Sequence, residues 1–175
     1  MGNFNNYYGY EHYIPANNLS KGFHGVLFAY LKHYCKPNDQ LLLIAENEAV
    51  LPVFREHFPV LDITCQGYGG EKGEEFHDLN IHRAYMPQYN LILSQALLEH
   101  ICMPCVAIRN MADLLHKEGY IFIHTHNSKM GYHAFPVDCV RFYKDFFTEL
   151  QKYMPIKLIE FDECAEHIFV AYQKL

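Results

Sequence analysis

The sequence has few cationic residues and no long apolar run. It contains 14 lysines and arginines against 20 aspartates and glutamates, for a formal net charge of −6. The cationic residues do not cluster, whereas surfaces that bind nucleic acids depend on clustered positive charge, so we expect no nucleic-acid partner.

No apolar run approaches the ~20 residues of a membrane span. The N-terminus lacks the basic flank and apolar core of a signal peptide. We therefore expect a cytoplasmic protein with no membrane partner.

The chain also lacks repeats, linkers and low-complexity segments. Its 175 residues, half of them hydrophobic, suffice for one domain with a sizeable core. Residues 1–16 are rich in aromatic residues and asparagine but have no periodicity. We expect residues 1–16 to form an N-terminal arm that packs on the domain or on a partner, and residues 17–175 to form a single domain. The six cysteines are scattered in mostly apolar contexts, as reduced core thiols are.

Short apolar runs alternate with helical patterns along the chain. Strands are predicted at residues 41–44, 61–65, 75–79, 90–93, 120–123, 156–161 and 168–172, and helices at 23–34, 50–58, 96–101 continuing from Pro104 to Gly119, and 140–150. This alternation predicts an α/β fold: a doubly wound, mostly parallel, seven-stranded sheet with helices on both faces. The last two strands are expected to form a hairpin, which makes the C-terminal strand antiparallel.

Polar residues follow the apolar run at residues 120–123. Such groups line the ligand crevice at the carboxyl ends of the strands in an open α/β sheet, so this loop is the first candidate for an active site. Its candidate residues are His124, His126, Asn127, Tyr132, His133, Asp138 and Arg141.

Three segments resemble motifs of the class I S-adenosylmethionine-dependent methyltransferases, in particular of type 11-like members. YNLILSQALLEHI (residues 89–101) is similar to the fourth motif, a strand followed by Leu-Glu-His. ADLLHKEGYIFIHT (residues 112–125) is similar to a later helix, turn and strand, and HNSKMGYHAFPVDCVRF (residues 126–142) to the segment after the fifth strand. The resemblance covers about residues 38–175 and implies a Rossmann-like fold.

The glycine-rich first motif is degenerate in this sequence. The family places an acidic residue on the first strand, followed by Gly-x-Gly-x-Gly. In LLLIAENEAV, Leu43 stands at the acidic position, and Ala45, Asn47 and Ala49 stand at the three glycine positions. These substitutes are small, and asparagine tolerates a left-handed backbone, so a tight turn is still expected. The resemblance implies S-adenosylmethionine as cofactor and assigns its binding to Ala45, Glu46, Asn47, Gln66, Asp78, Leu79, Ser94 and Gln95.

His124, His126 and His133 have three interpretations. One of them could be a general base that takes a proton from a hydroxyl or amine acceptor. Together they could form an open zinc site, or they could be ordinary polar loop residues. We take them as catalytic candidates and assign no metal ligand. The substrate-binding candidates are His100, Asn127, Tyr132, Asp138 and Arg141, although Asp138 and Arg141 are three residues apart and could simply pair with each other.

The favoured hypothesis is a methyltransferase that acts on an oxygen or nitrogen of a small polar acceptor, such as a sugar or glycan precursor. The alternative is a catalytically decayed binding or regulatory subunit of the same fold. A metal-dependent hydrolase is the most distant interpretation. The N-terminal arm could mediate a homo-oligomer or contact a partner protein in either of the first two cases.

Overall fold

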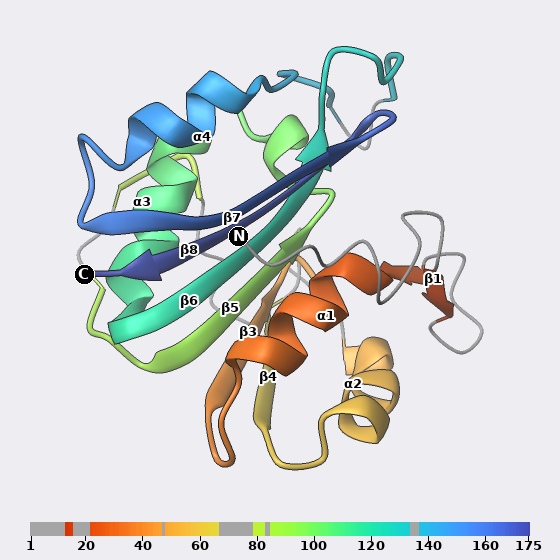
Figure 1. Cartoon of the computed structure of the whole chain (residues 1–175), viewed down its shortest axis with the longest axis vertical. Helices are drawn as coiled ribbons and strands as arrows, with labels where there is room; N and C mark the ends of the chain where they lie inside the picture. The colour runs from red at the N-terminus through yellow and green to blue at the C-terminus, as the bar shows by residue number, and fades with distance from the viewer. Residues whose placement is uncertain (1–12, 16–21, 47, 67–78, 83–84, 134–136) are drawn as a thin grey trace.

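The structure is a computed structural model, and it describes residues 13–15, 22–46, 48–66, 79–82, 85–133 and 137–175. Its helices and strands follow one another along the chain as shown in Figure 1. The bounds are β1 (Tyr13–Pro15), β2 (Gly22–His24), α1 (Gly25–Tyr34), β3 (Gln40–Ile44), η2 (Glu48–Val50), α2 (Leu51–His57), β4 (Asp62–Gln66), β5 (Tyr89–Gln95), η3 (Leu98–His100), α3 (Pro104–Leu114), β6 (Leu115–His126), α4 (Lys144–Leu150), β7 (Ile156–Cys164) and β8 (His167–Lys174). Among these described helices, none is long and apolar enough to cross a membrane.

The main sheet has the strand order β4-β3-β5-β6-β8-β7. Strands β4, β3, β5 and β6 are parallel, and β8 runs antiparallel to both β6 and β7. The antiparallel C-terminal strand and its hairpin are therefore confirmed. In the described part of the chain this sheet has six strands rather than the predicted seven. The additional strand was expected at residues 75–79, of which 75–78 lie outside the described residues and Leu79 lies in a turn.

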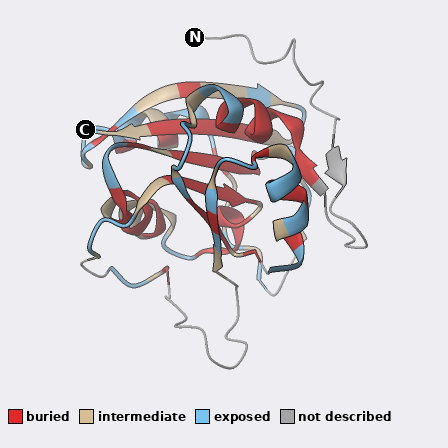
Figure 2. Ribbon diagram, turned by 90° about the horizontal axis from the view of Figure 1, so that it is seen from below, coloured by how far each residue is buried: buried red, intermediate tan, exposed pale blue. Residues whose placement is uncertain are grey.

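Side chains alternate between the two faces of the sheet and form two apolar clusters. Leu41 and Leu43 of β3 join the cluster that contains α1 and α2, whereas Leu42 and Ile44 join the cluster that contains α3 and α4. A run of four apolar residues in one strand is buried on both faces for this reason. Figure 2 shows the result, with buried residues concentrated in the strands and on the helix sides that meet them.

The helix boundaries differ from the prediction at several places. Of the helix predicted at residues 96–101, only the short 3-10 helix η3 forms, and α2 ends at His57 rather than Phe58. Two further boundaries differ because the flanking residues form other backbone contacts. Helix α1 begins at Gly25 rather than Phe23, since residues 22–24 pair with β1. Helix α4 begins at Lys144 rather than Val140, because the Cys139 and Val140 N–H groups donate to the Glu99 carbonyl and Phe142 bridges to Asn127.

Helix α3 begins at Pro104 as predicted but ends at Leu114 rather than Gly119. Residues from Leu115 onward belong to β6, in which Leu115 pairs with Tyr89 of β5. A Cβ atom at Gly119 would lie 2.7 Å from the Asn90 carbonyl oxygen. Gly119 therefore serves the close approach of two strands, not the end of a helix.

The six cysteines all lie in the described ranges, and none forms a disulfide. Four are partly buried, while Cys102 and Cys139 are exposed. The prediction of thiols without disulfides agrees with the structure. The prediction of core thiols holds in part, because Cys35, Cys65 and Cys105 pack against the apolar clusters.

Candidate functional site

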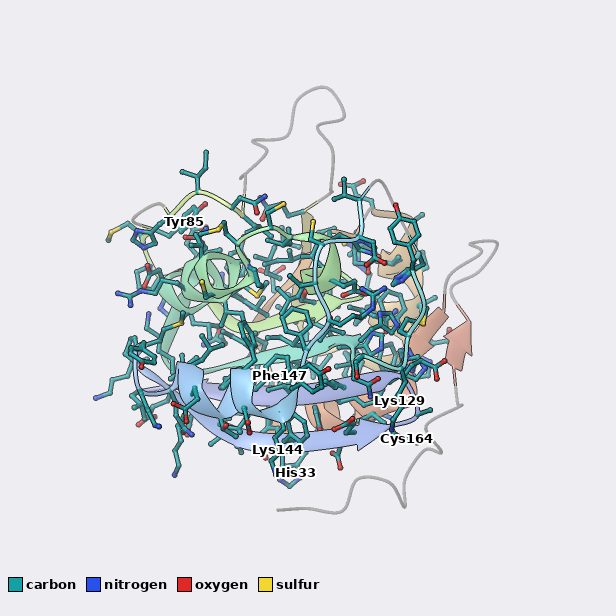
Figure 3. The ribbon with its side chains drawn as sticks, turned by 90° about the horizontal axis from the view of Figure 1, so that it is seen from above. His33, Tyr85, Lys129, Lys144, Phe147 and Cys164 are labelled. Atoms are coloured by element: carbon teal, nitrogen blue, oxygen red, sulfur yellow. The ribbon has the colours of Figure 1, made fainter. Side chains whose placement is uncertain are left out.

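The candidate site lies where the carboxyl ends of β5 and β6 meet the beginning of β8. In Figure 3, Lys129 and Cys164 mark this end of the sheet. The antiparallel pairing of β6 with β8 sets His126 directly opposite His167. The site is therefore built from residues that are far apart in the sequence and become neighbours only through the register of the sheet.

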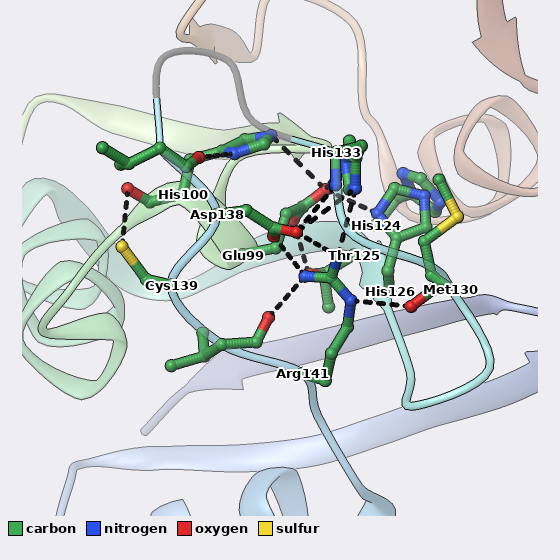
Figure 4. Close-up of polar contacts among 12 residues, drawn as sticks. Glu99, His100, His124, Thr125, His126, Met130, His133, Asp138, Cys139 and Arg141 are labelled. Carbon is green, nitrogen blue, oxygen red and sulfur yellow. Dashed lines mark hydrogen bonds and ion pairs between the residues drawn. The ribbon is translucent and has the colours of Figure 1, made fainter.

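Glu99 is the centre of the site. Its side chain, held by the short helix η3, is fully buried. One carboxylate oxygen accepts a hydrogen bond of 2.6 Å from the Thr125 hydroxyl, and the other accepts one of 2.6 Å from His126 Nδ1 (Figure 4). Burial by itself would raise the pKa of Glu99, but the hydrogen bonds from His126 and Thr125 and the charge of His126 outweigh it, so the pKa is lowered. Glu99 is therefore a buried carboxylate that orients a histidine.

The hydrogen bond to Glu99 also determines how His126 can react. Because Nδ1 donates to the carboxylate, Nε2 carries the lone pair of the neutral ring and can accept a proton. The carboxylate would stabilise the imidazolium that results. His126 and Glu99 together form a dyad suited to general base catalysis.

Two more histidines approach the same carboxylate. His133 Nε2 lies 3.8 Å and His100 Nε2 4.0 Å from a Glu99 oxygen. His100 Nδ1 is 2.5 Å from the Val137 carbonyl oxygen, to which it donates, so Nε2 of that ring faces the site. The structure thus brings together His100, His126 and His133 from the predicted residues and adds Glu99 as their common partner.

Asp138 and Arg141 pair with each other, as one interpretation of the sequence suggested. Arg141 Nη2 donates to an Asp138 oxygen at 2.5 Å and to the Gly131 carbonyl at 2.7 Å, and the His133 N–H donates to Asp138 at 2.8 Å. The hydrogen bond from Arg141 is the main reason that the pKa of Asp138 is lowered to about 2. This ion pair shapes the loop that carries His133 to the site.

Asn127 and Tyr132 lie apart from this group. The Asn127 amide donates to the Glu163 carboxylate and the Ala165 carbonyl, each at 2.8 Å, and so holds the turn between β7 and β8. Tyr132 is 82% exposed. The structure does not bring these two predicted substrate-binding residues together with Glu99.

The turn after β3 has a left-handed backbone at the first of the three replaced glycine positions. Ala45 has a φ of 61°, a conformation that usually favours glycine. Glu46, the next residue, is buried, and its N–H donates to the Gln66 carbonyl at the end of β4 at 3.2 Å. The chain therefore turns tightly here although the glycines are replaced.

The other predicted cofactor-binding residues have different surroundings. Ser94 and Gln95 are buried at the end of β5, and the Gln95 side-chain oxygen accepts a hydrogen bond of 2.9 Å from the His24 N–H. Leu79 is buried in the apolar cluster on the α3 and α4 face. Asn47 and Asp78 lie outside the described residues.

Sequence reasoning missed three residues that the structure places at the site. Glu99 is part of the Leu-Glu-His motif, but the motif does not indicate that its carboxylate is the partner of His126. His167 could have been found by pairing the hairpin with the preceding strand, which sets it opposite His126. His24 contacts the site from the end of β2, and its ring centroid lies 4.1 Å from that of His124. No pattern near His24 in the sequence indicated this position.

No protein-family model and no curated protein matches the sequence. Solved structures do match. An S-adenosylmethionine-dependent methyltransferase from Aquifex aeolicus has a TM-score of 0.60 and 10% identity over 85% of this chain and 89% of that one. The 1,6-didemethyltoxoflavin-N1-methyltransferase of Burkholderia thailandensis, solved with that compound and S-adenosylhomocysteine, has a TM-score of 0.58 and 9% identity over 85% and 76%.

The (4+2)-cyclase SpnF is as similar, with a TM-score of 0.58 and 9% identity over 94% of this chain and 88% of that one. At identities this low, the TM-scores show a shared fold but not a shared reaction. The chain has the fold of the class I S-adenosylmethionine-dependent methyltransferases.

Proposed function

We propose that this protein transfers a methyl group from S-adenosylmethionine to an oxygen or nitrogen of a small polar acceptor, such as a sugar or glycan precursor. The observation that carries the proposal is the buried dyad of Glu99 and His126 at the carboxyl edge of the sheet, beside the end of β5. Methyl transfer to a hydroxyl or an amine requires a group that takes up the proton, and His126 Nε2 is suited to that task.

The turn after β3 supports binding of the cofactor. With a φ of 61° at Ala45 and only methyl side chains at Ala45 and Ala49, the backbone can approach a nucleoside closely. Glu48 is exposed, so its charge is solvated. The cofactor when bound supplies an electrophilic methyl group. The residues that would hold it are Ala45, Glu46, Asn47, Gln66, Asp78, Leu79, Ser94 and Gln95.

The remaining side chains would orient the acceptor and move one proton. His126 Nε2 takes the proton of the attacking hydroxyl or amine, while Glu99 holds Nδ1 and stabilises the imidazolium. His133, which is partly exposed, and His100 present their Nε2 atoms toward the same carboxylate and would contact the polar acceptor. Alignment of the two reactants by these side chains would be the main contribution to the rate.

Calorimetric titration with S-adenosylmethionine and S-adenosylhomocysteine tests the cofactor. We expect micromolar binding of both.

Transfer of a labelled methyl group to a panel of sugar nucleotides and small amines then tests the reaction. His126→Ala should lower kcat about 100-fold or more without weakening the binding of the cofactor. His116→Ala, at the exposed opposite end of β6, should leave kcat and cofactor binding unchanged. A His126→Ala enzyme with full activity would exclude the dyad as the base.

A second candidate function follows from Glu46. This buried carboxylate lies in the turn where the carboxylate of the cofactor would be expected, and two like charges repel each other. A chain with this obstacle would be a binding or regulatory subunit, and residues 1–16 would contact its partner or a second copy. Under this alternative the wild type gives no heat with either ligand, and Glu46→Gln restores binding.

A further inference from the structure

We infer that His24, His124 and His167 form a binding site for a divalent zinc ion. The sequence suggested zinc ligation by His124 with His126 and His133, but the structure groups His124 with other partners. His24 comes from the end of β2, His124 from β6 and His167 from the beginning of β8. The potential ligand atoms of the three rings lie within 4.8 Å of one another. This inference does not depend on the proposed methyl transfer.

The distances suit three ligands of one tetrahedral ion. Zinc binds imidazole nitrogen at about 2.0–2.1 Å, so two such nitrogens around one ion lie roughly 3.3 Å apart. His124 Nε2 and His167 Nδ1 are 3.0 Å apart, and their ring centroids are separated by 5.1 Å. A small outward movement of these two rings would admit the ion between their nitrogens.

His24 supplies the third ligand from the other side. Its ring centroid lies 4.1 Å from that of His124 and 4.6 Å from that of His167. These separations are shorter than for the other pair, so the His24 side chain would rotate outward on binding. The backbone of His24 is held in place meanwhile, because its N–H donates to Gln95.

A carboxylate supports the ligand role of His167. Glu166 Oε1 lies 3.7 Å from His167 Nε2, the ring nitrogen that does not face His124. Metal-binding histidines commonly present their distal N–H to a carboxylate, which fixes the lone pair of the other nitrogen toward the metal. Glu166 is therefore a positioning residue for His167 and does not bind the ion.

The type of ligand selects the type of ion. Three neutral imidazoles suit zinc and other late first-row ions, whereas calcium and magnesium prefer oxygen. Three protein ligands leave a fourth position for water or an oxygen of a substrate, as in catalytic zinc sites. The ring of His126 lies 5.0 Å from that of His124 and 5.4 Å from that of His167, so the ion would be adjacent to the proposed base.

A second group of Glu99, His100 and His133 is the competing site, with ligand atoms that also lie within 4.8 Å of one another. Its carboxylate already accepts hydrogen bonds from Thr125 and His126, and both histidines are 3.8 Å or more from it. A metal at this group would have to displace those hydrogen bonds. An ion in the all-nitrogen group would displace the hydrogen bond between His124 and His167 but would leave the hydrogen bonds of the Glu99 carboxylate in place.

Elemental analysis and equilibrium dialysis against zinc, on full-length protein without a histidine tag, test the inference. We expect one zinc per chain. His124→Ala and His167→Ala should each weaken zinc binding at least about 100-fold. Glu166→Gln should weaken it about 10-fold. His133→Ala, which removes the competing site, and His116→Ala, at the exposed end of β6, should retain the wild-type affinity.

Cobalt substitution provides a measurement that does not depend on the buried variants folding. Wild-type protein loaded with cobalt should show the visible absorption of a tetrahedral ion, and X-ray absorption of the zinc form should show three imidazole ligands. Zinc binding no stronger in the wild type than in His124→Ala would overturn the inference and leave His124 and His167 as a hydrogen-bonded pair only. Loss of zinc in His133→Ala with retention in His124→Ala would also overturn it, in favour of the Glu99 group.

Discussion

At the end of β3 the chain turns through small side chains and a left-handed backbone. At the ends of β5 and β6 and the beginning of β8, by contrast, it is held together by charged and polar side chains. The turn depends on a single stretch of sequence, with Ala45 at φ 61°. The other half depends on Glu99, which receives hydrogen bonds from Thr125 and His126 on a different strand. The turn keeps a tight, left-handed conformation without glycine, whereas the histidine half cannot easily lose one partner.

The largest expected effect is that of Glu99→Ala. The substitution leaves the buried Thr125 hydroxyl and His126 Nδ1 without their acceptor, so we expect the free energy of unfolding to fall by about 3 kcal/mol. Glu99→Gln, which keeps the volume and one carbonyl oxygen, should cost about half as much. Urea denaturation measures both. A loss no greater than that of the exposed Glu149→Ala would show that the network is not the stabilising feature of this half.

The ion pair of Asp138 and Arg141 should produce an intermediate effect that depends on pH. The pKa of Asp138 is lowered to about 2 in the folded chain, first by the hydrogen bond from Arg141. Because the unfolded pKa is about 3.9, the pair stabilises the folded chain above that pH and is lost as the pH falls toward 2. We expect the wild type to exceed Asp138→Asn by about 1 kcal/mol at about pH 6, with no difference near pH 2.

An exposed ion pair provides the matched control for that measurement. Glu149 and Lys152 are paired at 2.7 Å, and their side chains are 53% and 62% exposed. Glu149→Gln should change the free energy of unfolding by less than about 0.5 kcal/mol. If Asp138→Asn and Glu149→Gln changed the free energy of unfolding equally across the pH range, the ion pair of Asp138 would not stabilise the folded chain.

The smallest expected effect is at the turn. Ala45→Gly relieves the left-handed strain, roughly 1–2 kcal/mol, but gives the unfolded chain more freedom, roughly 0.4–1 kcal/mol. We expect a net stabilisation of about 0.5 kcal/mol, seen as a higher midpoint of urea denaturation. Ala45→Val, which adds a branched side chain to the same backbone conformation, should destabilise instead. Destabilisation by glycine would mean that the Ala45 methyl group contributes packing that outweighs its strain.

Six of the seven predicted strands coincide with strands of the main sheet, and the hairpin of β7 and β8 is where the sequence indicates it. The helix boundaries were less predictable. Residues 140–142 belong to the predicted helix, yet the Val140 N–H donates to the Glu99 carbonyl and Phe142 pairs with Asn127 after β6. A periodic pattern reports which side chains are buried but not which backbone groups already have partners.

The sequence by itself determined the alternation of strands and helices, the antiparallel C-terminal strand and the polar loop after residues 120–123, because these follow from local apolar patterns. Only the tertiary structure decided which polar residues meet. Glu99 contacts Thr125 and His126 from 26 and 27 residues away, and His124 contacts His167 from 43 residues away. The pairing of β5 with β6 brings Glu99, which follows β5, to Thr125 and His126, and the register between β6 and β8 brings His124 to His167. The sequence shows which residues are histidines but not which residues they contact, because those contacts depend on how the strands pair.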